Sequence, residues 1–185
     1  YTYGLSEAQE REMIEDAFFT IEKHTGKGPA GYLAPALSHS EHTMDLFAEA
    51  GGIYTCDLFH DDQPTPIRVR NGNKFISVPY SLEMNDTIAY VVNKVEPRRY
   101  GEMIKENFDR LYKEGAESGT VMCIPTHNYQ VGCPHRMRAL EQALEYITGH
   151  SDVWVTTGRE IAEYFIKHYY DTSCADIRAK VGGIN

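Results

Sequence analysis

Hydrophobic residues recur along much of this chain at the spacing of an amphipathic helix. Behind a capping-box pattern at Ser6–Gln9, the apolar stripe from Ile14 to Ile21 predicts a first helix that ends at Gly26. The same spacing predicts four further helices: one opens at a second capping-box pattern, Ser38–Glu41, and ends at Gly51-Gly52; one runs from Pro97 to Gly115; and two carry the stripes Met137–Ile147 and Ile161–Phe165.

Short runs of β-branched and aromatic residues alternate with these helices. They predict five strands, at residues 31–34, 53–59, 75–80, 120–126 and 152–156. The turn signal Asn71-Gly72 predicts a small hairpin arm over residues 67–73. Alternation of strands and helices implies an α/β fold with a mainly parallel sheet, either open or forming most of a barrel.

Composition narrows the choice of partners. The chain has 185 residues and a formal net charge of −9, which argues against a nucleic acid or an anionic membrane surface as partner. No stretch approaches the roughly 20 apolar residues that cross a bilayer, and no signal peptide is recognisable. The four cysteines form no CxxC pair, and Cys56 and Cys123 lie in apolar runs, so we expect core thiols and a cytoplasmic protein.

Polar side chains follow the ends of the predicted strands. The groups are His60-Asp61-Asp62, then Glu83, Asn85 and Asp86, then His127, Asn128 and Tyr129, and finally Thr157. Because the carboxyl ends of parallel strands meet at one edge of a sheet, these groups would converge there. Carboxylates, an amide and an imidazole on one face are what a hydrolytic site requires, but loops are polar in any case. His127 is therefore either catalytic or a satisfied loop histidine, and Asp61-Asp62 is either functional or an acidic turn.

Other polar residues leave similar alternatives open. His39 and His42 share one helix face as a metal pair would, but zinc needs a third ligand, so surface histidines are the simpler interpretation. His135, Arg136 and Arg138 form either a solvated helix face or an anion contact.

Five segments, in order along the chain, match a known family. They are Gly26–Leu37, Cys56–Pro64, Val78–Asp86, Thr126-His127 with Gly132, and Asp152–Ala162. On these segments the chain resembles the polysaccharide deacetylase superfamily, also called the NodB homology or carbohydrate esterase family 4-like superfamily. It resembles in particular the branch of cofactor-free allantoinases and cyclic amide hydrolases.

The resemblance implies a distorted (β/α) barrel that is incomplete here and lacks its first strands. The superfamily's Asp-Asp motif and H-S/T-x-x-H motif are not found at the expected places, and Gly31-Tyr32-Leu33 stands where the third motif usually holds an arginine. Residues 1–170 would be the C-terminal part of a catalytic barrel, and residues 171–185 a C-terminal tail. Since such a barrel exposes strand edges, we expect it to pair with a missing N-terminal half, a second chain or a second copy in a homo-oligomer.

The resemblance also implies roles for particular residues. His127 matches the late histidine that protonates the leaving nitrogen or stabilises the tetrahedral intermediate. Asp61 or Asp62 matches the acidic stretch that orients that histidine, and Glu83, Asn85 and Tyr129 are expected to contact substrate, with loop architecture as the alternative role of Glu83 and Asn85. No metal ligand is expected within this chain. A divalent metal such as zinc would be held by residues outside it, or the enzyme works without metal.

These inferences predict a hydrolase of non-peptide carbon–nitrogen amide bonds. The substrate would be a small-molecule amide, either an N-acetyl sugar or an allantoin-type or cyclic imide. The alternative is a non-catalytic, degenerate deacetylase-like module that serves as a subunit or interaction domain.

Overall fold

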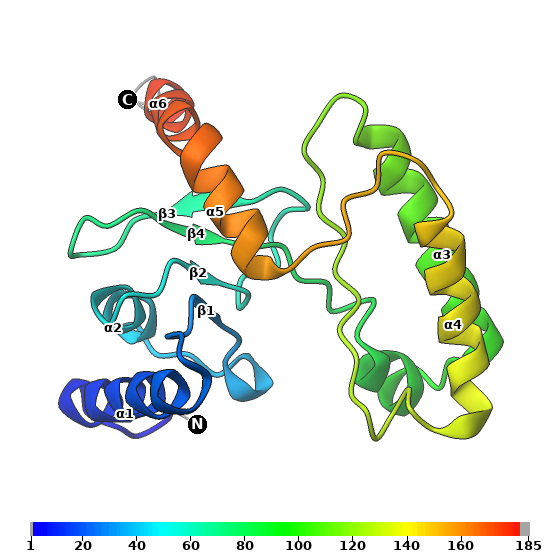
Figure 1. The fold of residues 1–185 in the computed structure, drawn as a ribbon, viewed down its shortest axis with the longest axis horizontal. Helices are drawn as coiled ribbons and strands as arrows, with labels where there is room; N and C mark the ends of the chain where they lie inside the picture. Colours follow the sequence, from blue (N-terminus) through cyan, green and yellow to red (C-terminus); the bar gives the residue numbers. More distant parts are fainter. Residues whose placement is uncertain (1, 182–185) are drawn as a thin grey trace. The chain divides into compact units, whose positions relative to one another are not determined.

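The structure, a computed structural model, describes residues 2–181 and divides them into two units (Figure 1). The first unit comprises the described residues up to Leu58, then Pro64–Val78, and then Thr157 onward. The second comprises Phe59–Gln63 and Pro79–Thr156.

A four-stranded sheet forms the centre of the first unit, in the order β1-β2-β4-β3. Strands β1 (Gly31–Tyr32), β2 (Tyr54–Thr55) and β4 (Phe75–Ser77) are parallel, whereas β3 (Thr65–Ile67) pairs antiparallel with β4. All three residues of β4 are buried, as expected for an inner strand covered on both faces. The mainly parallel α/β sheet is confirmed. A hairpin is also present, but its strands are β3 and β4, so most of the predicted range 67–73 forms the loop between them.

Helices cover this sheet. α1 (Glu7–Thr25) begins at the Ser6 capping box and ends at Gly26, whose φ of 74° is the left-handed cap that glycine favours. α1 packs against α2 (Thr43–Glu49), while α5 (Gly158–His168) contacts β4 and α6 (Tyr170–Val181) contacts β3. Leu46, Phe47 and Phe75 form the buried core between α2 and the sheet.

The second capping-box prediction is wrong, because α2 begins at Thr43 and not after Ser38. The Ser40 hydroxyl donates to the buried Glu10 carboxylate at 2.6 Å, and the Thr43 hydroxyl also bonds to Glu10. The hydroxyl of Ser38, the predicted cap, donates instead to the Pro35 carbonyl at 2.7 Å in the turn before it. A single 3₁₀ turn, Pro35–Leu37, lies in the preceding segment.

Two long helices dominate the second unit. α3 (Pro97–Glu114) and α4 (Pro134–Thr148) lie side by side (Figure 1), and a short π-helical turn, η2 (Ile88–Val92), precedes them. Their shared core contains Tyr90, Tyr100, Ile104, Phe108 and Ala143. The predicted helices 97–115 and 137–147 are thus confirmed.

Strands predicted at 120–126 and 152–156 are not formed. Residues 120–126 make isolated backbone hydrogen bonds: Val121 N–H donates to the Asp62 carbonyl at 2.8 Å, and the Pro125 carbonyl accepts from Asp86 N–H at 3.1 Å. A strand needs a continuous ladder to a neighbour, and the described residues supply none beside either segment.

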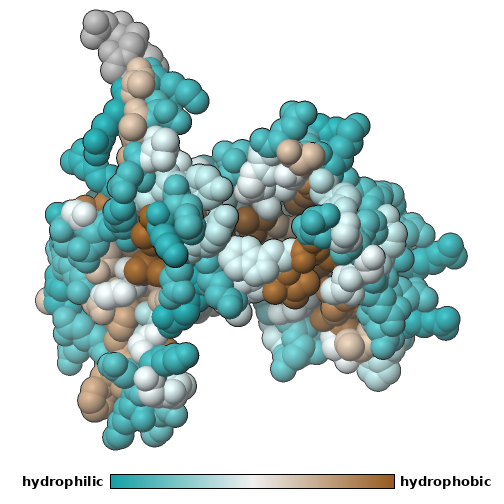
Figure 2. Space-filling view, turned by 45° about the horizontal axis from the view of Figure 1, so that its top comes forward, coloured by the Kyte–Doolittle hydropathy of each residue, from teal (hydrophilic) through white to brown (hydrophobic). Residues whose placement is uncertain are grey.

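The predicted tail 171–185 is helical up to Val181 as part of α6, and residues 182–185 lie outside the described range. No helix within residues 2–181 combines the length and apolarity needed to cross a membrane. Hydrophobic patches interrupt the polar surface (Figure 2), and exposed apolar side chains include Phe19, Leu33, Val92, Trp154 and Val155.

Candidate active site

His127 and Asp86 form a close pair in the second unit. His127 directly follows the extended segment 120–126, and Asp86 directly follows the loop after β4. His127 Nδ1 lies 2.6 Å from Asp86 Oδ1, and the His127 backbone N–H donates to Asp86 Oδ2 at 2.7 Å. The pair thus joins two segments that are 41 residues apart in the chain.

Asp86 is fully buried, yet its carboxylate is well satisfied. Besides the two contacts with His127, Oδ2 accepts a third hydrogen bond from Val131 N–H at 3.1 Å. Hydrogen bonds to a charged group contribute roughly 1.5–3 kcal/mol each, so three of them compensate for the burial of an ionised carboxylate.

The carboxylate also sets the tautomer of His127. An ionised Asp86 accepts hydrogen bonds only, so Nδ1 carries the proton, and the nearby Thr87 hydroxyl, 3.1 Å from Nδ1, acts as a second acceptor. Nε2 is then the ring atom available to a ligand, and the side chain is 37% exposed. A histidine held in this way can accept or donate a proton at Nε2.

A tight loop follows His127. Gln130 N–H and Val131 N–H both donate to the His127 carbonyl, and a Cβ at Gly132 would lie 2.1 Å from the Asn128 carbonyl oxygen. Only glycine fits at that approach. The loop leaves Tyr129 68% exposed, with its ring centroid 5.4 Å from that of His127.

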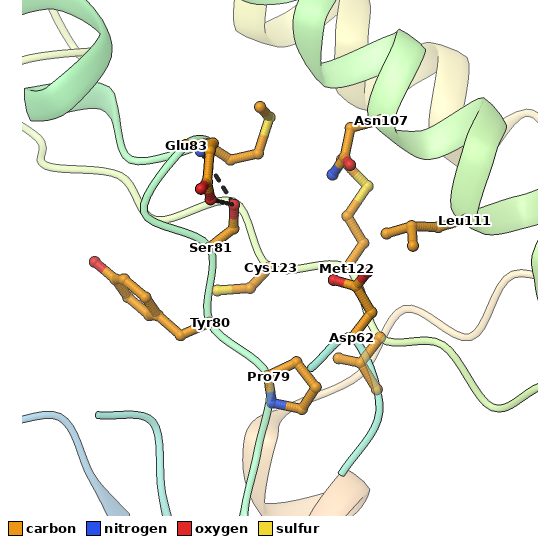
Figure 3. Close-up of a pocket in the computed structure, with 11 residues that line it drawn as sticks. Asp62, Pro79, Tyr80, Ser81, Glu83, Asn107, Leu111, Met122 and Cys123 are labelled. Atoms are coloured by element: carbon orange, nitrogen blue, oxygen red, sulfur yellow. Dashed lines mark hydrogen bonds between the residues drawn. The ribbon is translucent and has the colours of Figure 1, made fainter. Parts of the chain in front are cut away.

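Asp62 and Glu83 line one cavity of about 240 Å³ in the same unit (Figure 3). Tyr80, Ser81, Asn107 and Cys123 also line it. Burial raises the pKa of Asp62, and the negative charges of Asp61, Glu114 and Glu83 add to that rise. Burial likewise raises the pKa of the Cys123 thiol, which keeps it protonated and unreactive at neutral pH, as expected for a core cysteine.

Asn85 is committed to the loop itself. Its side-chain amide donates to the Tyr80 hydroxyl at 2.7 Å, and its Oδ1 accepts from Thr87 N–H and Ile88 N–H. These bonds support the architectural alternative for Asn85 more than substrate contact.

The expected carboxylate partner of His127 needs correction. The structure pairs His127 with Asp86, not with Asp61 or Asp62. Asp61 is exposed and accepts a hydrogen bond from Gln63 N–H, while Asp62 faces the cavity. Asp86 belongs to the polar group that follows β4, but nothing in its local sequence distinguishes it from Asp61 or Asp62.

His39 and His42 make separate contacts in the first unit. His39 Nδ1 lies 3.2 Å from Oδ2 of the buried Asp57, and His42 lies near the carboxylates of Glu7 and Glu41. Within residues 2–181, no group of three or more histidine, cysteine, aspartate or glutamate side chains could hold a metal ion. The described residues therefore do not fit a metal centre.

Known proteins resemble the chain in sequence and in fold. No model of a protein family matches the chain. The chain is 27% identical to the peptidoglycan deacetylase of Helicobacter pylori over an alignment of 196 positions, which covers 89% of this chain and 66% of that protein.

Two solved structures of proteins with related names have a similar fold. Puue allantoinase superposes with a TM-score of 0.82 and 31% identity, and a probable polysaccharide deacetylase from Pseudomonas aeruginosa PAO1 with a TM-score of 0.81 and 29% identity. Each match covers 91% of this chain and 56% of the other.

These matches support the resemblance of the chain to the NodB-type polysaccharide deacetylase superfamily. The chain spans about two thirds of the Helicobacter pylori relative and little more than half of either solved chain. The predicted fold class is thus confirmed as part of a deacetylase-type barrel.

Proposed function

We propose that the protein hydrolyses non-peptide carbon–nitrogen amide bonds. The observation that carries this proposal is the His127–Asp86 pair, in which a fully buried carboxylate fixes the tautomer of a partly exposed imidazole. The names of the related proteins support it, since deacetylation and allantoin hydrolysis both cleave such bonds.

His127 acts in this proposal as the general acid. Water adds to the carbonyl carbon of the amide, and the carbon–nitrogen bond then breaks as Nε2 of the imidazolium gives its proton to the departing nitrogen. The products are a carboxylic acid and an amine. An amine anion is a very poor leaving group, so protonation of the nitrogen is where a positioned acid contributes most.

Asp86 supports this step without touching the substrate. Its negative charge stabilises the imidazolium, and its bonds to the backbone N–H groups of His127 and Val131 hold the ring and its loop in place.

Substrate contacts are proposed for Tyr129 and Glu83. The exposed Tyr129 ring beside His127 offers a flat apolar face for a sugar or imide ring, and the carboxylate of Glu83 can accept hydrogen bonds from hydroxyl or amide groups. Asp61 and Asp62 remain candidates for catalytic roles that do not involve holding His127.

We also propose that the protein is cytoplasmic and associates with another chain or with a second copy of itself. All four cysteines, in the part of the chain that the structure describes, are free thiols, which fits a reducing cytoplasmic environment. β1 lies at the edge of the sheet, and the exposed Leu33 follows it directly, which fits association with another chain or a second copy. Light scattering of the purified protein tests the oligomeric state.

A substrate panel tests the proposed activity. We expect the full-length protein to release acetate from an N-acetyl sugar, or to open the ring of allantoin or of a cyclic imide. Absence of turnover on all three classes, by a protein that is folded by circular dichroism, would contradict the proposal.

A further inference from the structure

Arg136 lies under the loop that carries His127. It belongs to the first turn of α4, and its Nη1 donates to the Gln130 carbonyl at 2.9 Å and to the Gln130 side-chain oxygen at 3.2 Å. Gln130 is itself bound through its N–H to the His127 carbonyl. The guanidinium is thus one hydrogen bond away from the residue that bears the imidazole.

The guanidinium also stacks on Tyr90. Its central carbon lies 4.3 Å from the centre of the Tyr90 ring, at the distance of a cation–π contact. Tyr90 belongs to η2, the turn that begins directly after Asp86 and Thr87. The stack therefore connects the segment that follows Asp86 with the segment that follows His127.

Tyr90 is a firm support. Only 7% of it is exposed, its ring lies 5.0 Å from that of the fully buried Tyr100, and the Tyr100 hydroxyl donates to the Met84 carbonyl at 2.7 Å. The Tyr90 hydroxyl and Arg136 Nε are both buried without a hydrogen-bond partner. Such orphaned polar atoms are costly, and stacking of the guanidinium face on the ring is the evident gain that offsets them.

No carboxylate in residues 2–181 forms an ion pair with Arg136. The neighbouring Arg138 is exposed, as predicted for a solvated helix face. Arg136 is half-buried and does not fit that prediction. The two arginines, two positions apart on one helix, form a natural pair of test and control.

We propose that Arg136 is a positioning residue for the His127–Asp86 pair, acting through its bonds to Gln130 and its stack on Tyr90. Asp86 holds the loop by accepting from the N–H groups of His127 and Val131, and Arg136 holds the same loop by donating to the carbonyl of Gln130. The two contacts fix the imidazole from both sides. The inference deepens the proposed hydrolysis and rests on it for its kinetic consequence.

Arg136→Met, Arg136→Lys and Tyr90→Leu, with Arg138→Met as control, test this role in the full chain. We expect Arg136→Met to lower kcat by about 10–100-fold with KM nearly unchanged, because a loosened acid misplaces the proton without weakening ground-state binding. Arg136→Lys keeps the positive charge and a donor group without the planar guanidinium, and should recover part of that loss. Because Arg136 and Tyr90 act as one unit, kcat of the double variant Arg136→Met/Tyr90→Leu should fall no further than kcat of the more impaired single variant.

Hydrogen exchange of the Val131 amide provides a readout that does not depend on activity. We expect exchange at least about 10-fold faster in Arg136→Met and Tyr90→Leu, and unchanged in Arg138→Met, with global unfolding little altered. Unchanged Val131 exchange and kcat in Arg136→Met would overturn the proposal. A rise in KM alone, for anionic substrates, would overturn it too and make Arg136 a substrate contact. If the wild-type protein turns over no substrate of the panel, the proposed function fails while the exchange measurement still decides the role of Arg136.

Discussion

Three hydrogen bonds converge on the carboxylate of Asp86, and all of them come from the loop that begins at His127. The carboxylate orients a ring and anchors a backbone turn at the same time. This double use explains why a fully buried charge is tolerated beside a half-buried imidazole.

Replacement of Asp86 by Asn should therefore be severe. An amide presents an N–H₂ group where one of the two oxygens accepts, so either a backbone bond or the Nδ1 bond is lost and the other tautomer of His127 is favoured. We expect kcat to fall by about 10²–10⁴-fold. An Asp86→Asn protein whose kcat stays close to that of the wild type would contradict the assignment of Asp86 as the partner of His127.

His127 could be found from the sequence, since it directly follows a predicted strand and precedes a glycine loop. Its partner could not, because Asp61, Asp62 and Asp86 all follow strands and carry the same chemistry. Only the path of the chain brings residue 86 to residue 127. The role of Arg136 was equally hidden, since its spacing is that of an ordinary helix face.

Elements with strong local signals could be predicted well. The capping box at Ser6, the left-handed Gly26 and the amphipathic stripe of α3 act within one or two turns of helix. The start of α2 could not, because the Ser38 hydroxyl bonds to the Pro35 carbonyl and the Thr43 hydroxyl to the distant Glu10. The segments 120–126 and 152–156 could not, because no strand within residues 2–181 pairs with them. β-Structure depends on partners that sequence alone does not supply.

Helices α3 and α4 approach each other closely at Gly101. A Cβ at Gly101 would lie 2.8 Å from the Ala139 carbonyl oxygen, so Gly101→Ala forces the two helices apart. We expect a loss of about 1–3 kcal/mol in the free energy of unfolding, measured by urea denaturation. Gly119→Ala, where the added carbon meets nothing within 4 Å, is the matched control. Equal stabilities of the two variants would show that the helices do not pack this closely.

The free energy of unfolding should fall at acidic pH because of the surface ion pairs that Glu49 makes with Arg70 and Arg11. Hydrogen bonds from Arg70 and Arg11 lower the pKa of Glu49 to about 2 from its ordinary 4.5. A carboxyl whose folded pKa is depressed contributes stability above its unfolded pKa, and that contribution is lost as the pH falls from about 4.5 toward 2. Arg70→Met should flatten this part of the stability profile, and Arg68→Met should not.

Asp57 acts in the opposite direction. Burial raises its pKa, although the Ala34 N–H and His39 oppose the rise. A carboxyl whose folded pKa is raised contributes most below its unfolded pKa, and the contribution falls as the pH rises through the folded value. Asp57→Asn should remove this dependence, and urea denaturation of both proteins between pH 4 and about 7 tests it. A profile that is identical in the two proteins would exclude the effect.

The affinity of the whole chain for zinc can be measured directly. Because no three suitable ligands meet within residues 2–181, we expect no zinc site of sub-micromolar affinity formed by this chain alone. Calorimetric titration of the chelator-treated chain measures it. One tightly bound zinc ion per chain would contradict the expectation.

The central claim is that His127 protonates the leaving nitrogen, and His127→Asn tests it most directly. Asn keeps a donor toward Asp86, so the loop should remain folded while Nε2 is lost. On a substrate from the panel that the wild-type protein hydrolyses, we predict that kcat falls by about 10²–10⁴-fold, with unchanged thermal stability and a smaller loss for amides whose amine is a better leaving group. A His127→Asn protein that turns over at the wild-type rate would contradict the account.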